Sequence, residues 1–249
     1  MPPRLPQKPG SKGSLKWVQT LVNQHPAILN TAIGDALGIE PASIEWRSPL
    51  AADDHAEYRD QGFLDALGIN LPRHPLPAFW PDRGPQWDAL ARTSTGVILV
   101  EAKAHIREMT STCAAGPASM ARIQASFSMV KQAIGAPADA DWTTPYYQYA
   151  NRIAHLYLLR ELNGIEADLV NLCFLNDHEM AGPTTAGQWQ EAIQTVHAAL
   201  GLPSGGLMKH VRHVFVDVGA SSESTGRPCS HQGVARQSST PSPPNHHPD

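Results

Sequence analysis

Hydrophobic residues recur every three or four positions in the first part of the chain, a spacing typical of helices with one buried face. Leu15 and Val18 begin such a pattern directly after Ser14, a residue type that caps helices. A second pattern lies between Pro26 and Gly38, since proline favours the first turn of a helix and glycine favours its end. The residues expected to face inward from this second helix are Ile28, Leu29, Ile33 and Leu37.

Further helices follow from the same periodicity. One is expected to begin at Asp53 or Asp54 and to end near Leu67, which puts Glu57 on its first turns. Pro117 opens a long helix that Gly135 ends. The remaining helices are predicted over residues 144–163 and 188–200.

Apolar runs of strand length separate these helices. Residues 97–100 are apolar at every position, as in a strand covered on both faces, and residues 167–175 have a similar character. Residues 211–218 alternate between apolar and polar, and shorter strands are predicted at 44–46 and 78–80. Strands and helices in this order predict an α/β or α+β domain with extra helices at both ends.

The two ends of the chain differ in composition from its middle. Residues 1–13 are rich in Pro, Lys and Gly, and we expect them to be disordered. Residues 219–249 are rich in Ser, Pro, Gly and His with almost no aliphatic side chains, which predicts a disordered tail. The folded part is therefore predicted to be one domain over residues 14–218.

Charge and composition narrow the class of protein. The chain has 19 basic and 23 acidic residues, a net charge of −4, and this excludes a broadly basic protein that coats nucleic acid. No apolar run reaches the length of a membrane span, and the start lacks the apolar stretch of a secretory signal. The cysteines, Cys113, Cys173 and Cys229, lie far apart. We therefore expect free thiols and a cytoplasmic protein that does not enter a membrane, with the oligomeric state left open.

A hairpin around residues 93–96 brings charged residues together. If its strands pair residues whose numbers sum to 189, Leu90 lies opposite Leu99 and Asp88 lies opposite Glu101. Lys103 is on the same face as Glu101, because side chains alternate along a strand. Two carboxylates about 4 Å apart repel by roughly 4 kcal/mol at an effective dielectric constant near 20. One lysine offsets only part of this repulsion, so the hairpin predicts a bound divalent cation.

These residues resemble a known signature. An acid, a strand turn and then Glu-Xaa-Lys at the end of an apolar strand is the pattern of the PD-(D/E)XK nuclease superfamily, carried here by Trp87-Asp88 and Glu101-Ala102-Lys103. The resemblance implies a restriction-endonuclease-like α-β-β-β-α-β core with a mixed central sheet over about residues 53–175. It also implies that Asp88, Glu101 and the backbone carbonyl of Ala102 bind Mg²⁺ or Mn²⁺, while Lys103 orients the attacking water.

Two more residues enter through the resemblance. Glu57 is where many members add an acid to the metal site, and Gln148 is where many carry a polar residue on a later helix. The chain departs from the pattern because Asp88 follows tryptophan, whereas the literal Pro-Asp is Pro81-Asp82. We favour Asp88 over Asp82, because the hairpin puts Asp88 opposite Glu101.

The helix predicted over 144–163 has a polar face. Gln148, Asn151, Arg152 and His155 fall within about 100° of one another around its axis. A solvated or structural role for this face is the main alternative to a catalytic one. A third option is that Arg152, with Asn151, contacts a substrate phosphate.

The sequence therefore predicts a nuclease that hydrolyses phosphodiesters with a metal-activated water, with DNA a better candidate substrate than RNA by analogy. The alternatives are a catalytically silent module of this fold that binds protein or nucleic acid, and a hydrolase of other phosphate esters. The simplest alternative for Asp88, Glu101 and Lys103 is a surface ion pair at a sheet edge. No Walker A loop, dinucleotide-binding glycine motif or Gly-Xaa-Ser-Xaa-Gly elbow is present in the sequence.

Overall fold

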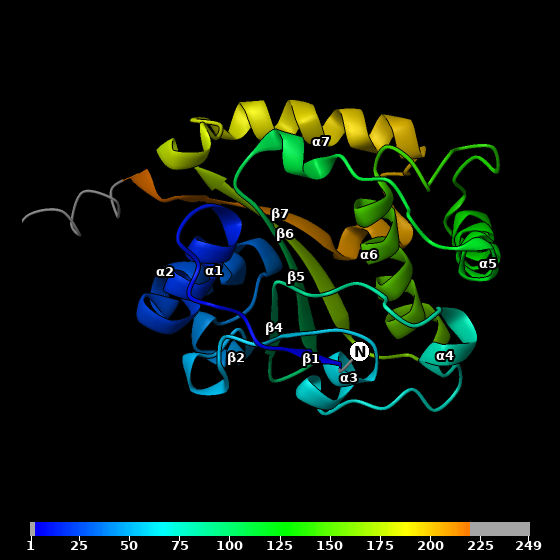
Figure 1. Cartoon of the computed structure of the whole chain (residues 1–249), viewed down its shortest axis with the longest axis horizontal. Coiled ribbons are helices and arrows are strands. Elements are labelled where there is room, and N and C mark those ends of the chain that lie inside the picture. Colours follow the sequence, from blue (N-terminus) through cyan, green and yellow to red (C-terminus); the bar gives the residue numbers. More distant parts are fainter. Residues whose placement is uncertain (1–2, 220–249) are drawn as a thin grey trace, which may run out of the picture.

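The computed structural model describes residues 3–219 and contains a mixed five-stranded sheet with helices on both faces (Figure 1). The strand order is β2-β4-β5-β6-β7. Neighbouring strands are antiparallel from β2 to β5 and parallel from β5 to β7. The strands are β2 (Glu45–Ser48), β4 (Ala89–Arg92), β5 (Val97–Lys103), β6 (Ala167–Leu175) and β7 (Val211–Asp217).

Seven α-helices occur within residues 3–219, and none of them is long and apolar enough to cross a membrane. Their bounds are α1 (Gly13–Gln24), α2 (Pro26–Leu37), α3 (Gln61–Leu67), α4 (Leu76–Phe79), α5 (Pro117–Ile134), α6 (Tyr147–Tyr157) and α7 (Ala186–Leu200). A π-helical turn, Leu158–Leu162, continues α6.

The connections explain why the sheet is mixed. A tight turn joins β4 to β5, so these strands are antiparallel. Helices α5 and α6 separate β5 from β6, and α7 separates β6 from β7. Parallel neighbours need crossovers of this kind. Both faces of β5 and β6 are then covered, which accounts for their nearly continuous apolar sequences.

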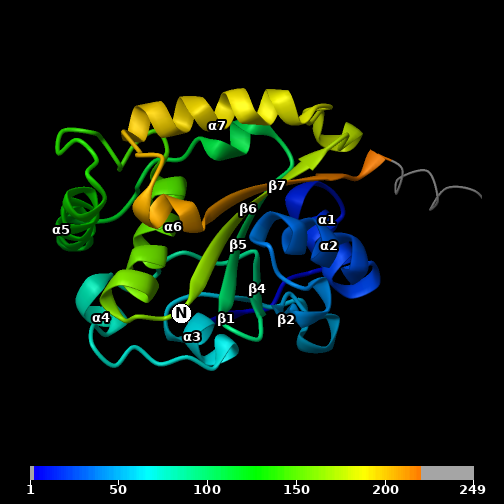
Figure 2. The ribbon, with the colours of Figure 1, turned by 180° about the vertical axis from the view of Figure 1, so that it is seen from behind.

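The helices form a layer on each side of the sheet (Figure 2). Helices α1 and α2 cover one face, where Ile98 and Val100 of β5 are buried. Helices α6 and α7 cover the other face with α3, α4 and α5 around them, and here Val97 and Leu99 are buried. The charged residues at the end of β5 that lie on the Leu99 face are therefore directed toward α6.

Several sequence predictions are confirmed. The hairpin register is the expected one, with Leu90 opposite Leu99 and Arg92 opposite Val97. Strand β6 has the predicted bounds, and the α/β class with a mixed sheet is correct. Glycines end α2 and α5 as expected, because Gly38 and Gly135 have positive φ angles of 70° and 77°.

The predicted disorder at the N-terminus is wrong for its described part. Arg4 and Leu5 form strand β1 (Arg4–Leu5), which pairs with β3 (Glu57–Tyr58) in a separate two-stranded sheet. Residues 1–2 and the tail predicted over 219–249, apart from residue 219, lie outside the described residues. The first helix begins at Gly13, and the predicted cap Ser14 makes no capping hydrogen bond.

The helix predicted from Asp53 or Asp54 is also wrong in its first half. Glu57 belongs to β3, and the helix α3 begins only at Gln61. The carboxylate of Asp53 accepts hydrogen bonds from Arg4 Nε at 2.9 Å and from the Tyr58 hydroxyl, so it does not cap a helix. A contact across about fifty residues of sequence therefore overrides the local capping signal.

Three smaller expectations differ from the structure. Residues 78–80 were expected to form a strand but belong largely to α4, where the Phe79 carbonyl accepts a hydrogen bond from Ser126 Oγ. Ile28 is 48% exposed, although it was expected to face inward. The sheet also extends beyond the predicted core of 53–175, because β2 precedes it and β7 follows it.

Candidate active site

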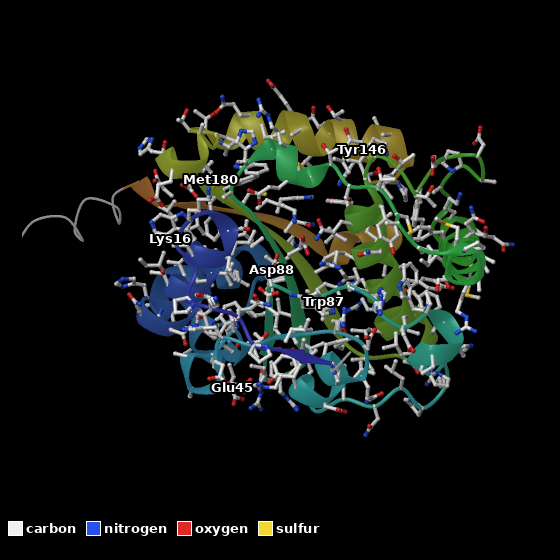
Figure 3. The ribbon with its side chains drawn as sticks, viewed as in Figure 1. Lys16, Glu45, Trp87, Asp88, Tyr146 and Met180 are labelled. Atoms are coloured by element: carbon white, nitrogen blue, oxygen red, sulfur yellow. The ribbon has the colours of Figure 1, made fainter. Side chains whose placement is uncertain are left out.

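Asp88 directly precedes strand β4 and lies near the middle of the molecule (Figure 3), and Glu101 directly follows Val100, the register partner of Ala89. The backbone N–H of Ala102 donates a hydrogen bond of 2.7 Å to Asp88 Oδ2. Asp88 lies one residue before Ala89, the first residue of β4, and its side chain takes the place of a further backbone partner for β5. No hydrogen bond joins Asp88 Oδ1 to any residue within 3–219, so this oxygen is free to accept another group.

Glu101 lies beneath helix α6 and is only 3% exposed. Its Oε1 accepts a hydrogen bond from Lys103 Nζ, and its Oε2 accepts one of 2.6 Å from Arg152 Nε. Burial alone would raise the pKa of Glu101, but Arg152 and Lys103 outweigh burial and hold the pKa below its ordinary value. Glu101 is therefore an ionised carboxylate at neutral pH with two cationic partners.

The negative charge of an ionised Asp88 is balanced less well by its neighbours. Burial, followed by the negative charge of Glu101, raises the pKa of Asp88 to about 8, although Lys103 and the Ala102 N–H act in the opposite direction. The pKa of Lys103 is raised because Glu101 and Asp88 outweigh the effect of its burial. The site therefore holds an ammonium group beside a carboxyl group that binds a proton at neutral pH.

Glu57 reaches the same region from β3, not from a helix as expected. Burial raises its pKa and the charge of Glu101 adds to this effect, while a hydrogen bond from Gln86 Nε2 to Glu57 Oε2 lowers it. Counting Glu57, Asp88 and Glu101 against Lys103 and Arg152, the site has one more acid than cations. A divalent cation bound here would take the place of the proton on Asp88.

Gln148 lies where sequence analysis expected it, on the first turn of α6 beside the acid pair. Its Oε1 accepts a hydrogen bond of 3.2 Å from Lys103 Nζ. The helix begins at Tyr147, later than predicted, and Ser111 Oγ accepts a hydrogen bond of 2.8 Å from the Gln148 backbone N–H. Ser111, from a loop distant in sequence, thus binds a free N–H at the start of α6. This contact holds the first turn of α6 next to Lys103.

The polar face of α6 is buried, so the solvated alternative for it is wrong. Arg152 donates to Glu101, to Asn151 Oδ1 at 3.0 Å and to the Gln86 carbonyl at 2.7 Å. Its guanidinium also lies over the Trp87 ring, 4.7 Å from the ring centroid. With 3% of its side chain exposed, Arg152 serves as the counter-ion of Glu101, and this geometry does not favour the predicted phosphate contact of Arg152 and Asn151.

His155 lies one turn further along α6 and packs among the rings of Phe63, Phe79, Trp80 and Trp87. Burial lowers its pKa to about 3, so the imidazole is neutral. Its Nδ1 lies 2.8 Å from the Asn151 carbonyl, which makes this nitrogen the donor. His155 is therefore part of the apolar packing and not a general base exposed to a substrate.

The alternative acid, Asp82, is exposed in the loop between α4 and β4. It takes no part in the interactions that shift the pKa values of Asp88 and Glu101. The preference for Asp88 over Asp82 thus agrees with the geometry. Sequence analysis missed the roles of Gln86, which links Glu57 to Arg152, and of Trp87, which lies under Arg152; neither role has a signal in the local sequence.

The available ligand groups limit how a metal ion could bind at this site. Within residues 3–219, no three His, Cys, Asp or Glu side chains converge closely enough to hold a metal ion, so Glu57 does not join Asp88 and Glu101 as a third direct ligand. Mg²⁺ needs only one or two carboxylates and keeps several waters. In a strand, the N–H and C=O of one residue point to the same side, so the Ala102 carbonyl is directed toward Asp88. Asp88, Glu101 and this carbonyl fit a partly hydrated Mg²⁺ or Mn²⁺.

Comparison with known proteins adds no relative: no protein-family model, no curated protein and no solved structure matches this chain.

The pairing of Arg152 with Glu101 generates a prediction about stability. Arg152→Met should lower the free energy of unfolding by about 3–5 kcal/mol, because it leaves the buried Glu101 charge without its main partner. Urea denaturation measures this loss. Arg47→Met is the matched control, because Arg47 pairs with Glu45 and the two side chains are 36% and 64% exposed. Loss of this exposed pair should change the free energy of unfolding by less than about 1 kcal/mol. Similar losses in both variants would contradict the account.

Proposed function

We propose that this protein is a metal-dependent phosphodiester hydrolase that acts on nucleic acid. The observation that carries the proposal is the convergence of Asp88, Glu101 and Lys103 at the end of a buried hairpin, next to Gln148. Two carboxyl groups, one of which releases its proton when a cation binds, suit a hard divalent cation, and a lysine beside them suits developing negative charge. A surface ion pair at a sheet edge would not leave Glu101 only 3% exposed.

Each residue has a distinct task in this proposal. Asp88 Oδ1, a lone pair of Glu101 and the Ala102 carbonyl would hold Mg²⁺ or Mn²⁺. The bound ion lowers the pKa of a coordinated water and stabilises charge on the phosphate. Lys103, oriented by Glu101 and Gln148, would provide a positive charge near the attacking water. Arg152 keeps Glu101 ionised and in place, and Glu57 adds negative potential without direct contact.

The order of elements gives further support for a restriction-endonuclease-like core. Along the chain, α2 precedes the three antiparallel strands β2, β4 and β5, and α6 leads into β6, which is parallel to β5. With β3, α3 and α4 between β2 and β4 and α5 before α6 treated as additions, this order is compatible with the α-β-β-β-α-β order that the resemblance to the PD-(D/E)XK superfamily implies. DNA as the substrate rests on that analogy, and RNA is the alternative substrate.

One observation favours a second candidate, a module of this fold without catalysis. Both oxygens of Glu101 already accept hydrogen bonds from cations, and one oxygen of Asp88 binds the backbone. In that case the acids stabilise the fold only, and divalent cations have no effect on the protein. Metal binding therefore separates the two candidates.

The proposal predicts which variants lose activity. Asp88→Asn and Lys103→Met should each reduce Mn²⁺-dependent cleavage of plasmid and single-stranded DNA by roughly 100-fold or more, because the first removes a charged metal ligand and the second removes the positive charge beside the attacking water. Asp82→Asn is the matched control and should cleave like the unaltered chain, because Asp82 is exposed and outside the cluster. Circular dichroism checks that all variants fold. Full activity of folded Asp88→Asn or Lys103→Met protein would exclude these roles.

Metal binding should depend on pH through Asp88. Its pKa of about 8 in the folded chain means that a proton competes with the cation at neutral pH. Mn²⁺ affinity should therefore rise by up to about tenfold per unit between pH 6 and 8 and level off above that range. Isothermal titration calorimetry in buffers of different ionisation enthalpy measures both the affinity and the released proton. An affinity that stays constant over this interval would contradict the role of Asp88, and Asp82→Asn should keep the slope.

A further inference from the structure

One hydroxyl group joins three secondary-structure elements on the face of the sheet that α6 and α7 cover. The hydroxyl oxygen of Tyr149, on α6, lies 2.7 Å from Nε2 of His197 on α7 and 2.9 Å from Nε2 of His213 on β7. The rings of Tyr149 and His213 are stacked, and the centroids of the two imidazoles lie 5.5 Å apart. These three side chains, the Tyr149 triad, connect α6, α7 and β7 through hydrogen bonds.

The number of protons in the Tyr149 triad determines its tautomers. Burial raises the pKa of Tyr149, so the hydroxyl keeps its single proton at neutral pH. It can donate this proton to only one imidazole, and the other imidazole must donate its Nε2–H to the hydroxyl oxygen. A neutral imidazole carries one N–H, so the imidazole that accepts from Tyr149 has its proton on Nδ1. The triad therefore needs two neutral histidines with opposite tautomers.

The two tautomers respond differently to acid. The imidazole with Nε2–H can take up a proton at Nδ1 and still donate to the Tyr149 hydroxyl. The other imidazole can take up a proton only at Nε2, where it accepts the hydrogen bond from Tyr149. A second proton therefore leaves two N–H groups directed at one oxygen, removes the acceptor of the hydroxyl proton and brings two positive rings together. The first proton breaks no hydrogen bond, whereas the second one does.

The surroundings provide no counter-ion for the second positive charge. Burial lowers the pKa of both imidazoles, and for His213 a charge on His197 adds to the effect and gives a pKa of about 4. No carboxyl group within residues 3–219 contributes to either pKa. Burial raises the pKa of Cys173 on β6 to about 12, so this neighbour of Tyr149 is a neutral thiol, and Lys103 beyond it is positive. His213 is thus the harder of the two histidines to protonate.

We propose that the Tyr149 triad is an acid-sensitive latch between α6, α7 and β7 that stays closed with one added proton and opens with the second. When it opens, the two positive rings separate and the C-terminal half of α7, which carries His197, loosens. Ile193 on the same half of α7 borders the small cavity that Lys103 also borders, so opening changes the packing beside the candidate site. The latch does not depend on the proposed nuclease function.

Nitrogen NMR tests the latch directly. Long-range ¹H–¹⁵N correlation spectra of the ¹⁵N-labelled full chain, recorded above neutral pH, distinguish the two neutral tautomers of each histidine. We expect Nε2–H at His197 and Nδ1–H at His213. On acidification His197 should be protonated first, and protonation of His213 should coincide with faster hydrogen exchange of the amides of residues 193–200. Identical tautomers, first protonation of the imidazole with Nδ1–H, or protonation of both without a change in α7 would each overturn the proposal.

The pH dependence of stability gives a second measurement. Both histidines have lowered pKa values, so the folded chain binds fewer protons than the unfolded chain between pH 6.5 and about 4, and stability falls as the pH falls through this range. Each histidine should lower the folding equilibrium constant by up to about tenfold per pH unit. His213→Gln keeps an acceptor for Tyr149 but cannot be protonated, so urea titrations should show a smaller pH dependence.

His25→Gln is the matched control, because His25 is exposed between α1 and α2, the helices on the other face of the sheet. It should keep the pH dependence of the unaltered chain. An equal pH dependence for His213→Gln and His25→Gln would contradict the latch. Neither measurement uses metal or cleavage, so the latch and the proposed function can fail separately.

Discussion

The burial of the Glu101 charge is the constraint on which the arrangement depends. A carboxylate at 3% exposure is stable only if cations and hydrogen bonds replace the water it has lost. Arg152 and Lys103 do so from opposite directions, one from helix α6 and one from the same strand. Arg152 then connects α6 to the Gln86 carbonyl and the Trp87 ring, so one charge fixes the helix, the strand and the segment before β4 relative to each other.

The same compensation is incomplete at Asp88. Two cations balance only two of the three carboxyl groups, and desolvation together with Glu101 leaves Asp88 with a strongly raised pKa. The pairing between β4 and β5 also stops at Ala89, so the Ala102 N–H has no partner in β4 and donates to Asp88 instead. The end of the β4–β5 pairing therefore provides a backbone oxygen beside a carboxyl group that can exchange its proton for a cation, and oxygen ligands of this kind are those that a hard cation selects.

Sequence could predict the part of this site that depends on pairing within the β4–β5 hairpin. Strand alternation and the turn at 93–96 were enough to place Asp88 opposite Glu101 with Lys103 on the same face, and the apolar run before Glu101 indicated a covered strand. Helical spacing correctly placed Gln148 near Lys103. What remained hidden depends on contacts between distant segments. Glu57 is on a strand because residues 4–5 pair with it, and Arg152 is a counter-ion because α6 packs over β5.

The central claim is that one divalent cation binds between Asp88 and Glu101 at the end of the hairpin. Crystals grown with Mn²⁺ and measured at a wavelength with manganese anomalous scattering test it most directly. The account predicts an anomalous peak at bonding distance from Asp88 Oδ1 and Glu101, with the Ala102 carbonyl also directed at it. The absence of a peak at saturating Mn²⁺, or a peak that contacts neither carboxylate, would contradict the account.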